Sequence, residues 1–319
     1  MNMKSVQINK YGGSEVMEIN QNTKPPNPLP DKILVKVKAA GVNPVDWKIR
    51  EGYMQQMMPL RFPSTLGMDF SGIIKQVGGD REQQDLPTDF KPGDEVYGQA
   101  TVLNGGSGSF AEMALANVDS IAPKPKSLSH IEASSLPLVG VSAWQAIVEN
   151  IVLSEGQKIL IHGGAGGIGS IAIQLAKFLR AYVATTVSPD DMEFVKQLGA
   201  DDAIDYKSQT FGDLLHDYDA VFDTVGGQTY TKSFKVLKRN GIIVSMIEQP
   251  NKDLMEQFGV TAIFLFTQVN RERLTQLGQW VAQNNIKVHI DKTFSIDEAA
   301  KALDYVKDIH PRGKIALTM

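Results

Sequence analysis

The spacing of apolar residues changes near residue 128 and divides the chain into parts of different structure. Before this point, residues 32–40 (KILVKVKAA) alternate apolar and polar positions with the two-residue period of a strand. Other short apolar segments, bounded by Gly or Pro, predict strands at residues 69–77, 95–98 and 110–115, and a polar loop at residues 80–92. The first part is therefore expected to be rich in β-structure.

From residue 158 onward, short apolar segments alternate with amphipathic ones. The apolar segments predict strands at residues 158–162, 181–187, 202–206, 219–225 and 241–247. The amphipathic segments predict helices at residues 167–179, 190–198, 211–216 and 229–237. Regular alternation of strand and helix predicts an α/β domain built on a doubly wound parallel sheet.

Two pairs of residues have the spacing of a helix capping box, in which a Ser precedes a Glu by three positions. Ser129 and Glu132 form one pair, and Ser295 and Glu298 form the other. The end of the chain also predicts a helix at residues 271–284 and strands at residues 288–291 and 314–318. These last strands are candidates to join the β-structure of the first part.

A glycine-rich segment follows the strand expected at residues 158–162 and begins the helix expected at 167–179. It contains the pattern G-x-G-x-x-G on Gly164, Gly166 and Gly169. Between a strand and a helix, this pattern is the fingerprint of a dinucleotide-binding turn, where backbone N–H groups and the helix N-terminus hold a pyrophosphate. The alternative is a turn that binds nothing, and the strand–helix context favours the dinucleotide.

The end of the second strand bears on which dinucleotide is bound. NAD sites usually have an acidic residue there for the ribose hydroxyl, whereas this chain has Thr186, Val187 and Ser188. Hydroxyl groups in place of a carboxylate favour NADP, although no Lys or Arg follows closely and Asp190 is acidic. Ser188 also suits the N-cap of a helix that begins with Pro189, and the two roles are compatible.

Composition excludes several classes of protein. The 319 residues include no cysteine, so disulfides, thiolate nucleophiles and Cys-ligated zinc are excluded. The net charge is −4 and basic residues are not clustered, so binding to nucleic acid is not expected. No signal-peptide pattern and no long apolar segment is present, and a cytoplasmic location is expected.

Several segments resemble the medium-chain dehydrogenase/reductase superfamily, and more narrowly its zinc-independent quinone oxidoreductase and alkenal reductase branch. They include GVNPVDWKIREG (41–52), LGMDFSGIIKQVG (66–78), SLPLVGVSAWQAI (135–147), KILIHGGAGGIGSIAIQLAK (158–177), LGADDAIDY (198–206) and FDTVGG (222–227), in the family's order. The resemblance implies a GroES-like catalytic domain at 1–123 and 268–319. It implies a Rossmann dinucleotide-binding domain at 124–267.

Zinc ligands are where the chain departs from the alcohol dehydrogenases of this superfamily. The resemblance places Asn43 at the position of their catalytic zinc Cys, and Met68-Asp69 at the position of their His-Glu pair. The five histidines are dispersed without the spacing of ligands. A zinc-independent reaction is therefore expected.

The resemblance also implies which residues take part in the reaction. It places Asn43, Asp46 and Lys48 beside the nicotinamide, where Asn43 or Lys48 would bind a substrate carbonyl oxygen and Asp46 would order the loop. Tyr53 and Met57 are candidates for an apolar substrate pocket. The alternatives are a turn at Asn43, a solvated cation at Lys48 and simple surface cover for the pocket residues.

Cofactor contacts are implied in the same way. The residues are Ser142, Gly164, Gly166, Gly167, Ile168, Gly169, Thr186, Ser188, Tyr206, Val225, Gly226, Phe266 and Lys314. Structural alternatives exist for several: a packed aromatic at Tyr206, a buried strand at Phe266 and a solvated turn at Lys314.

The expected activity is hydride transfer from NADPH, with NADH less favoured, to a quinone or an α,β-unsaturated carbonyl. Such a reaction needs positioning and a donor for the developing oxyanion, and no covalent nucleophile. The alternatives are an enoyl-thioester reductase and a non-catalytic NADPH-binding sensor or RNA-binding protein. The resemblance further implies a homodimer formed through residues 242–247 and 263–266, and no membrane partner is expected.

Overall fold

The computed structural model describes residues 2–78, 90–284 and 286–319. The chain forms two compact units, one made of Met1–Leu138 with Val269–Met319 and the other of Val139–Gln268. The first unit extends to Leu138, beyond the boundary at residue 123 that the sequence analysis gave. The reason is that helix α2 (His130–Ser134) packs on strands of the first unit. Most of the loop expected at residues 80–92 lies outside the described residues.

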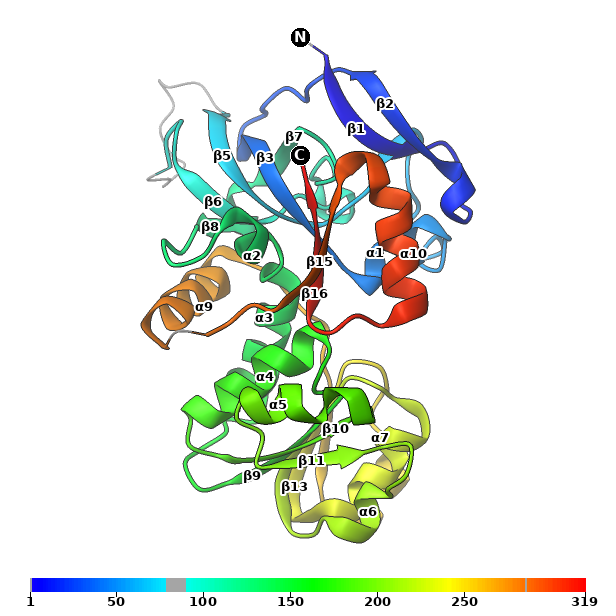
Figure 1. Cartoon of the computed structure of the whole chain (residues 1–319), viewed down its shortest axis with the longest axis vertical. Coiled ribbons are helices and arrows are strands. Elements are labelled where there is room, and N and C mark those ends of the chain that lie inside the picture. Colours follow the sequence, from blue (N-terminus) through cyan, green and yellow to red (C-terminus); the bar gives the residue numbers. More distant parts are fainter. Residues whose placement is uncertain (1, 79–89, 285) are drawn as a thin grey trace. The chain divides into compact units, whose positions relative to one another are not determined.

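The first unit is built on two antiparallel-rich sheets (Figure 1). The smaller sheet has the order β2-β1-β4, and the larger has the order β15-β16-β3-β5-β6-β8, with β7 paired to β3. The strands are β1 (Met3–Ile8), β2 (Met17–Thr23), β3 (Lys32–Val42), β4 (Ser64–Thr65), β5 (Asp69–Val77), β6 (Glu95–Gln99), β7 (Met113–Asn117), β8 (Ile121–Pro123), β15 (Ile290–Ser295) and β16 (Lys314–Thr318).

The two ends of the chain meet within this unit. Strand β16 pairs antiparallel with β3, with Ile315 opposite Val42. Helices α1 (Pro44–Arg50) and α10 (Ala299–Ile309) pack together over a shared apolar core that includes Ile49, Leu303 and Leu317. Residues more than 250 positions apart in sequence therefore lie side by side at the C-terminal end of β3.

The second unit is a six-stranded parallel sheet with the order β11-β10-β9-β12-β13-β14. Its strands are β9 (Lys158–His162), β10 (Tyr182–Val187), β11 (Asp202–Asp205), β12 (Tyr218–Asp223), β13 (Leu237–Ser245) and β14 (Thr261–Phe264). The order reverses between β9 and β12, and doubly wound sheets bind ligands at this point, beyond the carboxyl ends of the strands.

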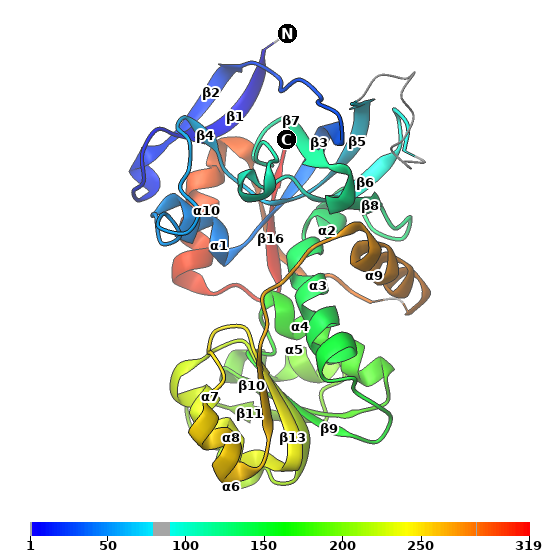
Figure 2. The same ribbon diagram turned by 180° about the vertical axis from the view of Figure 1, so that it is seen from behind.

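Helices cover the parallel sheet because a parallel strand needs a crossover connection. They are α4 (Gly167–Phe178), α5 (Met192–Gln197), α6 (Phe211–Leu214), α7 (Gly227–Ser233) and α8 (Lys252–Phe258). Residues of α6, α7 and α8 share one apolar cluster on the sheet, and α4 and α5 lie on the opposite face, as the right-handed crossover requires (Figure 2). Helix α3 (Pro137–Trp144) continues into a π-helical segment, Gln145–Asn150.

The sequence predictions of the second unit are confirmed, since each expected strand is present within a few residues of its predicted position. Both expected capping boxes are also present, before α2 and before α10. The prediction placed β15 at 288–291 rather than Ile290–Ser295. It missed β1, β2, β4, β8, β14, α1, α3 and α8. Helix α9 (Arg271–Asn284) lies where it was expected.

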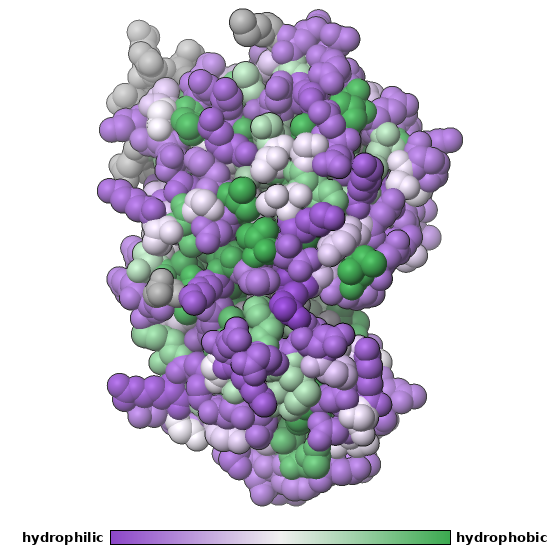
Figure 3. Space-filling model, in the orientation of Figure 1, coloured by the Kyte–Doolittle hydropathy of each residue, from purple (hydrophilic) through white to green (hydrophobic). Residues whose placement is uncertain are grey.

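Hydrophilic side chains cover most of the visible surface of each unit, with apolar side chains scattered between them (Figure 3). Among the described residues, each helix is too short or too polar to cross a bilayer.

Candidate active site

The glycine loop of the second unit lies between β9 and α4, at the point where the strand order reverses. Gly163 begins the loop with φ +70°, a backbone conformation that L side chains rarely adopt. Gly166 occupies the N-cap of α4, whose first N–H groups have no partner within the helix. These N–H groups and the positive end of the helix dipole form a binding site for a pyrophosphate.

Two glycines of the loop differ in what surrounds them, and the difference matches a dinucleotide site. A Cβ at Gly169 would lie 2.3 Å from the carbonyl oxygen of Gly163, so this glycine allows close packing of helix and loop. A Cβ at Gly166 would meet the described chain only at 3.4 Å, on Gly163 O, which leaves space on its outer side. The loop therefore fits the pyrophosphate of a dinucleotide that approaches the backbone at Gly166.

Thr186 lies under this loop at the end of β10, with 5% of its surface exposed. Its hydroxyl contacts His162 Nδ1 at 2.9 Å and accepts the Gly163 N–H at 3.4 Å, and its carbonyl accepts the Gly164 N–H at 3.2 Å. The structure thus brings Thr186 to the glycine loop, as a support for its backbone. A direct contact between the Thr186 hydroxyl and the cofactor stays a prediction.

Ser188 occupies the N-cap position of a short 3-10 helix that begins at Pro189. Its hydroxyl donates to the Asp191 carboxylate at 2.7 Å and makes no capping bond to the backbone. The expected position is confirmed, and the hydroxyl hydrogen bond goes to the acidic side chain instead.

Tyr206 and Lys207 extend the carboxyl edge of the sheet beside β10. Val187 lies opposite Asp205 in the parallel register, and the Tyr206 N–H donates to Val187 O at 3.2 Å. Tyr206 is 60% exposed, and the Lys207 ammonium lies 6.0 Å from the centre of its ring. Lys207 is a cation that sequence reasoning missed, because it follows the neighbouring strand β11 and not β10.

Val225 and Gly226 follow β12 and lie at the same edge of the sheet. Their N–H groups both donate to Asp223 Oδ1 at 3.0 Å, and Ser245 donates to Asp223 Oδ2 at 2.7 Å. This buried carboxylate holds the turn in place and leaves Val225 exposed. The structure therefore brings the turn after β12 next to the glycine loop after β9, as expected for a dinucleotide crevice.

Ser142 and Phe266 lie elsewhere in the second unit. Ser142 is buried in α3 with its hydroxyl 2.7 Å from that of Thr267. Phe266 follows the edge strand β14 and is 64% exposed, so its side chain is not part of a buried strand. Their contacts with a cofactor stay predictions.

In the first unit, a buried polar cluster lies where β3 meets α1. Asn43 donates through Nδ2 to Asp69 Oδ2 at 2.9 Å, and its Oδ1 accepts from the Lys314 ammonium, which also donates to Val42 O. Gln99 donates to Asp69 Oδ1 at 2.8 Å. Both ends of the Asn43 amide are thus bonded within the protein, and Asn43 has no exposed surface.

Asp46 joins this cluster through the first turn of α1. Its Oδ2 accepts the Asn43 N–H at 2.8 Å, which makes Asn43 the N-cap of a capping box. Its Oδ1 is buried and has no hydrogen-bond partner among the described residues. The sequence pattern Asn-Pro-x-Asp contains this capping box, a signal of a helix start that the sequence predictions did not use.

Burial dominates the electrostatics of the cluster. Removal from water raises the pKa of Asp46 to about 7 and also raises that of Asp69, because both carboxylates are fully buried. Burial lowers the pKa of Lys314 to about 8, although Asp69 and Asp46 favour its charged form. The ammonium of Lys314 supplies positive charge close enough to favour the charged forms of both carboxylates.

The residues of this cluster do not fit the zinc site of the alcohol dehydrogenases. Zinc needs Cys, His or carboxylate ligands, whereas the position of the Cys holds an amide whose oxygen accepts from a buried ammonium. Among the described residues, no group of three or more His, Asp or Glu side chains is placed to hold a metal. No step of the reaction is derived through zinc.

Lys48, Tyr53 and Met57 lie on and after helix α1. Tyr53 and Met57 are 70% and 75% exposed, and the Tyr53 ring contacts the edge of Trp47 at 5.7 Å between centres. The Lys48 ammonium lies 5.7 Å from the Trp47 ring, with which it forms a cation–π contact. The Lys307 ammonium lies 5.2 Å from the same ring. The structure thus brings two cations and Tyr53 to Trp47, and leaves Met57 exposed after the helix.

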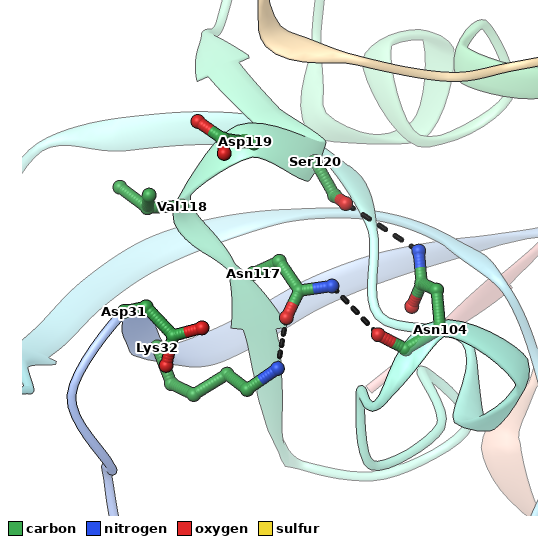
Figure 4. A pocket seen from close by; sticks show the side chains of 7 residues that line it. All are labelled: Asp31, Lys32, Asn104, Asn117, Val118, Asp119 and Ser120. Atoms are coloured by element: carbon green, nitrogen blue, oxygen red, sulfur yellow. Dashed lines mark hydrogen bonds between the residues drawn. The ribbon is translucent and has the colours of Figure 1, made fainter.

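A cavity of about 370 Å³ in the first unit is separate from these residues (Figure 4). Its polar side chains bond one another: Lys32 donates to Asn117, and Asn117 donates to Asn104 O at 2.7 Å. Asn104 in turn donates to Ser120 at 3.4 Å. Because these side chains bond one another, we assign no ligand to this cavity.

Comparisons with known proteins agree with this geometry. Residues 29–126 match the family model of the alcohol dehydrogenase GroES-like domain, and residues 198–317 match that of the zinc-binding dehydrogenases. A 2-methylene-furan-3-one reductase of Solanum lycopersicum is 36% identical, with 99% of this chain and 79% of the relative covered. An NADPH-dependent alkenal/one oxidoreductase of Arabidopsis thaliana is 34% identical over the same shares.

A solved structure gives the same result for the fold. The quinone oxidoreductase of Coxiella burnetii is 34% identical and superposes with a TM-score of 0.89, with 99% of each chain covered. The glycine loop, the absence of cysteine and these likenesses agree. The chain therefore belongs to the medium-chain dehydrogenase/reductase superfamily, in its zinc-independent quinone oxidoreductase and alkenal reductase branch.

Proposed function

We propose that this protein is an NADPH-dependent oxidoreductase that transfers hydride to a quinone or to an α,β-unsaturated carbonyl without zinc. The observation that carries the proposal is the glycine loop at the reversal of strand order, with open space at Gly166 and close packing at Gly169. Bound NADPH supplies the hydride. The protein itself supplies binding, orientation and stabilisation of charge.

The second unit binds the cofactor in this proposal. The first N–H groups of α4, at Gly167 and Ile168, bind the pyrophosphate, and Gly164, Gly166 and Gly169 shape the turn around it. Tyr206 and Lys207 bind the 2′-phosphate at the ends of β10 and β11, where Lys207 supplies positive charge. Val225, Gly226, Ser142 and Phe266 surround the nicotinamide end, and Thr186 acts on the loop from beneath.

The first unit binds the acceptor. Hydride addition to an enone or quinone leaves an enolate or quinol anion with negative charge on the carbonyl oxygen. A proton from water completes the reduction, at the α-carbon of the enone or at the oxygen of the quinol. Lys48 donates a hydrogen bond to that oxygen and stabilises its charge. Tyr53 and Met57 cover the apolar body of the acceptor, and their exposure suits acceptors of different shape.

Asn43, Asp46 and Lys314 position α1 in this proposal. Asn43 caps the helix with Asp46, and Lys314 holds the Asn43 amide, so the helix that carries Lys48 begins at a fixed place. A contact of Lys314 with the cofactor, which the family resemblance implies, needs its buried ammonium to leave Asn43 and Val42.

Steady-state oxidation of NADPH with a panel of quinones and alkenals tests the activity. The Lys48→Met variant should lower kcat/KM by about 10–1000-fold, as loss of an oxyanion donor does, with NADPH binding unchanged. Lys36→Met, an exposed lysine on β3, is the matched control and should keep full activity. NADPH binding without turnover of any acceptor would show a non-catalytic binding protein instead.

Two alternative functions make different predictions in the same assay. An enoyl-thioester reductase would prefer thioester substrates to free alkenals by at least tenfold. An RNA-binding protein would shift a labelled RNA in a salt-sensitive manner without reductase activity.

The proposal includes a homodimer and a cytoplasmic location. Strand β14 ends the parallel sheet, so its outer edge offers unpaired backbone groups to a second copy, and exposed Phe266 follows it. Light scattering should give twice the mass of 34.9 kDa. A monomer that retains full activity would contradict the dimer, and cell fractionation tests the location.

A further inference from the structure

His162 is a buried residue that the proposed reaction does not use. It ends β9 directly before the glycine loop and has no exposed surface. Both ring nitrogens have partners: Nδ1 lies 2.9 Å from Thr186 Oγ1, and Nε2 lies 2.9 Å from Ser233 Oγ. The ring edge also packs on Phe211, with 4.7 Å between centres.

The hydrogen bonds of Ser233 determine the direction of those of His162. Ser233 Oγ donates its single hydrogen to Thr229 O at 2.7 Å, so it accepts from the Nε2–H of His162. Burial lowers the pKa of His162 to about 4, against an opposing effect of Asp223, so the ring is neutral at pH 7. A neutral imidazole with hydrogen on Nε2 has a lone pair on Nδ1, and Nδ1 therefore accepts the hydroxyl hydrogen of Thr186.

This direction fixes what Thr186 can do. Because the Thr186 hydroxyl donates its hydrogen to His162, its oxygen is free to accept hydrogen bonds. It accepts the N–H of Gly163, with 3.4 Å between nitrogen and oxygen. The Thr186 carbonyl accepts the next N–H of the loop, that of Gly164, at 3.2 Å. Thr186 thus holds the first two residues of the glycine loop.

The same chain of bonds reaches the other side of the crevice. Ser233 and Thr229 belong to α7, which begins next to Gly226 in the turn after β12. The His162 carbonyl accepts from Thr224 Oγ1 at 2.9 Å, one residue before Val225. The side chain of His162 therefore connects the end of β10 with the last residue of α7, and its backbone carbonyl connects the start of the glycine loop with the turn after β12.

We propose that His162 is a positioning residue for NADPH, which acts by orienting the Thr186 hydroxyl so that Thr186 holds the glycine loop in its binding conformation. The inference rests on NADPH binding at this loop and adds a residue that does not touch the cofactor. It also assigns Thr186 a role through the loop backbone, in place of donation to the cofactor phosphate.

Amide substitutions at His162 separate its two hydrogen bonds. The Asn side chain places an oxygen near the position of Nδ1 and keeps the acceptor for Thr186, whereas the Gln side chain places an NH2 group near Nε2 and keeps the donor for Ser233. We expect the Kd for NADPH, measured on the full chain by fluorescence titration, to rise less than about threefold in His162→Asn. It should rise about tenfold in His162→Gln and in His162→Leu.

Matched variants of the two partners distinguish positioning from general destabilisation. Thr186→Val removes the hydroxyl and should weaken NADPH binding about as much as His162→Leu, and the double variant should show no further loss. Ser233→Ala removes the acceptor that keeps the hydrogen on Nε2, so the hydrogen can move to Nδ1. This variant should lower the urea midpoint and weaken NADPH binding, by no more than His162→Leu does.

Each outcome decides the question. Equal Kd values for His162→Asn and His162→Gln, or a Ser233→Ala variant that binds NADPH more weakly than His162→Leu does, would overturn the positioning role of His162. Additive losses for Thr186→Val and His162→Leu would do the same. If the wild-type chain itself did not bind NADPH, the proposed function would fail together with this inference.

Discussion

Lys314 offers the sharpest test of the buried cluster in the first unit. Replacement by Met keeps the length and apolar stem of the side chain and removes its charge and its hydrogen bonds. Val42 O and Asn43 Oδ1 then lose their donor inside the protein. Asp46 and Asp69 remain buried, without the cation between them.

The expected loss of stability follows from these contacts. An acceptor left unsatisfied in the interior costs about 1–3 kcal/mol. Asp69 and Asp46 also lose the nearby cation that favours their charged forms, so the total approaches the cost of about 3–5 kcal/mol for leaving a buried charge uncompensated. For a unit of this size, such a loss should lower the melting temperature of the first unit by about 6–20 °C.

The measurement is urea denaturation at pH 7, followed by tryptophan fluorescence, since Trp47 and Trp280 both lie in the first unit. Lys36→Met removes an exposed cation from β3 of the same unit and should change the free energy of unfolding by less than about 0.5 kcal/mol. The Lys314→Met/Asp46→Asn double variant should be more stable than Lys314→Met. The amide oxygen that replaces the Asp46 carboxylate still accepts the Asn43 N–H, and one uncompensated charge is gone.

Equal stability of Lys314→Met and Lys36→Met would refute the ion-pair reasoning. A double variant that loses the full sum of the two single losses would refute the proximity of Asp46 to the ammonium. The Kd for NADPH of folded Lys314→Met adds a separate result. An affinity equal to that of the wild type would show that Lys314 positions Asn43 and does not bind the cofactor.

Three further predictions follow from other contacts. Asp46 has a folded pKa of about 7, above its ordinary value, so its contribution to stability is complete at low pH and is lost as the pH rises toward 7. Asp46→Asn should therefore flatten the fall in unfolding free energy between pH 4 and 7. An unchanged slope would contradict the raised pKa. Gly169→Ala should lower both the melting temperature and NADPH affinity, because its Cβ would lie 2.3 Å from Gly163 O. Gly212→Ala is the control and should be tolerated, because a Cβ there meets no atom of the described chain within 4 Å. Lys207→Glu should raise the Kd for NADPH by about tenfold or more and change the Kd for NADH by less than about twofold, as measured by titration with each cofactor. An equal effect on both Kd values would place Lys207 away from the 2′-phosphate.

The parallel sheet of the second unit was predictable because its signals are local. Each buried strand is a short apolar run, and each covering helix begins within a few residues of it, so the period of the sequence identifies both. The glycine loop was recognised for the same reason, since its strand, its glycines and its helix are contiguous. The six strands occur in an order that reverses at β9 and β12, as a doubly wound sheet requires.

The first unit was less predictable because its sheet joins distant segments. Strand β1 has buried residues on both faces, whereas no residue of β2 is buried, so neither shows the alternation that predicts a strand. Strand β16 was identified by its composition, whereas its pairing with β3 depends on residues about 270 positions away. An alternating pattern of apolar and polar residues predicts a strand, but it does not predict which other strand pairs with it.

The candidate site shows the same division between local and distant information. By itself, the sequence determined the dinucleotide loop, because its strand, glycines and helix form one contiguous motif. The family resemblance added Asn43 and Met68 at the positions of the zinc ligands. Only the tertiary structure decided that Lys314 bonds Asn43, that Lys207 lies beside the end of β10, and that His162 connects Thr186 with Ser233. Hydrogen bonds and buried charges depend on distance in space, and a chain that folds back on itself brings together residues whose spacing in sequence carries no period.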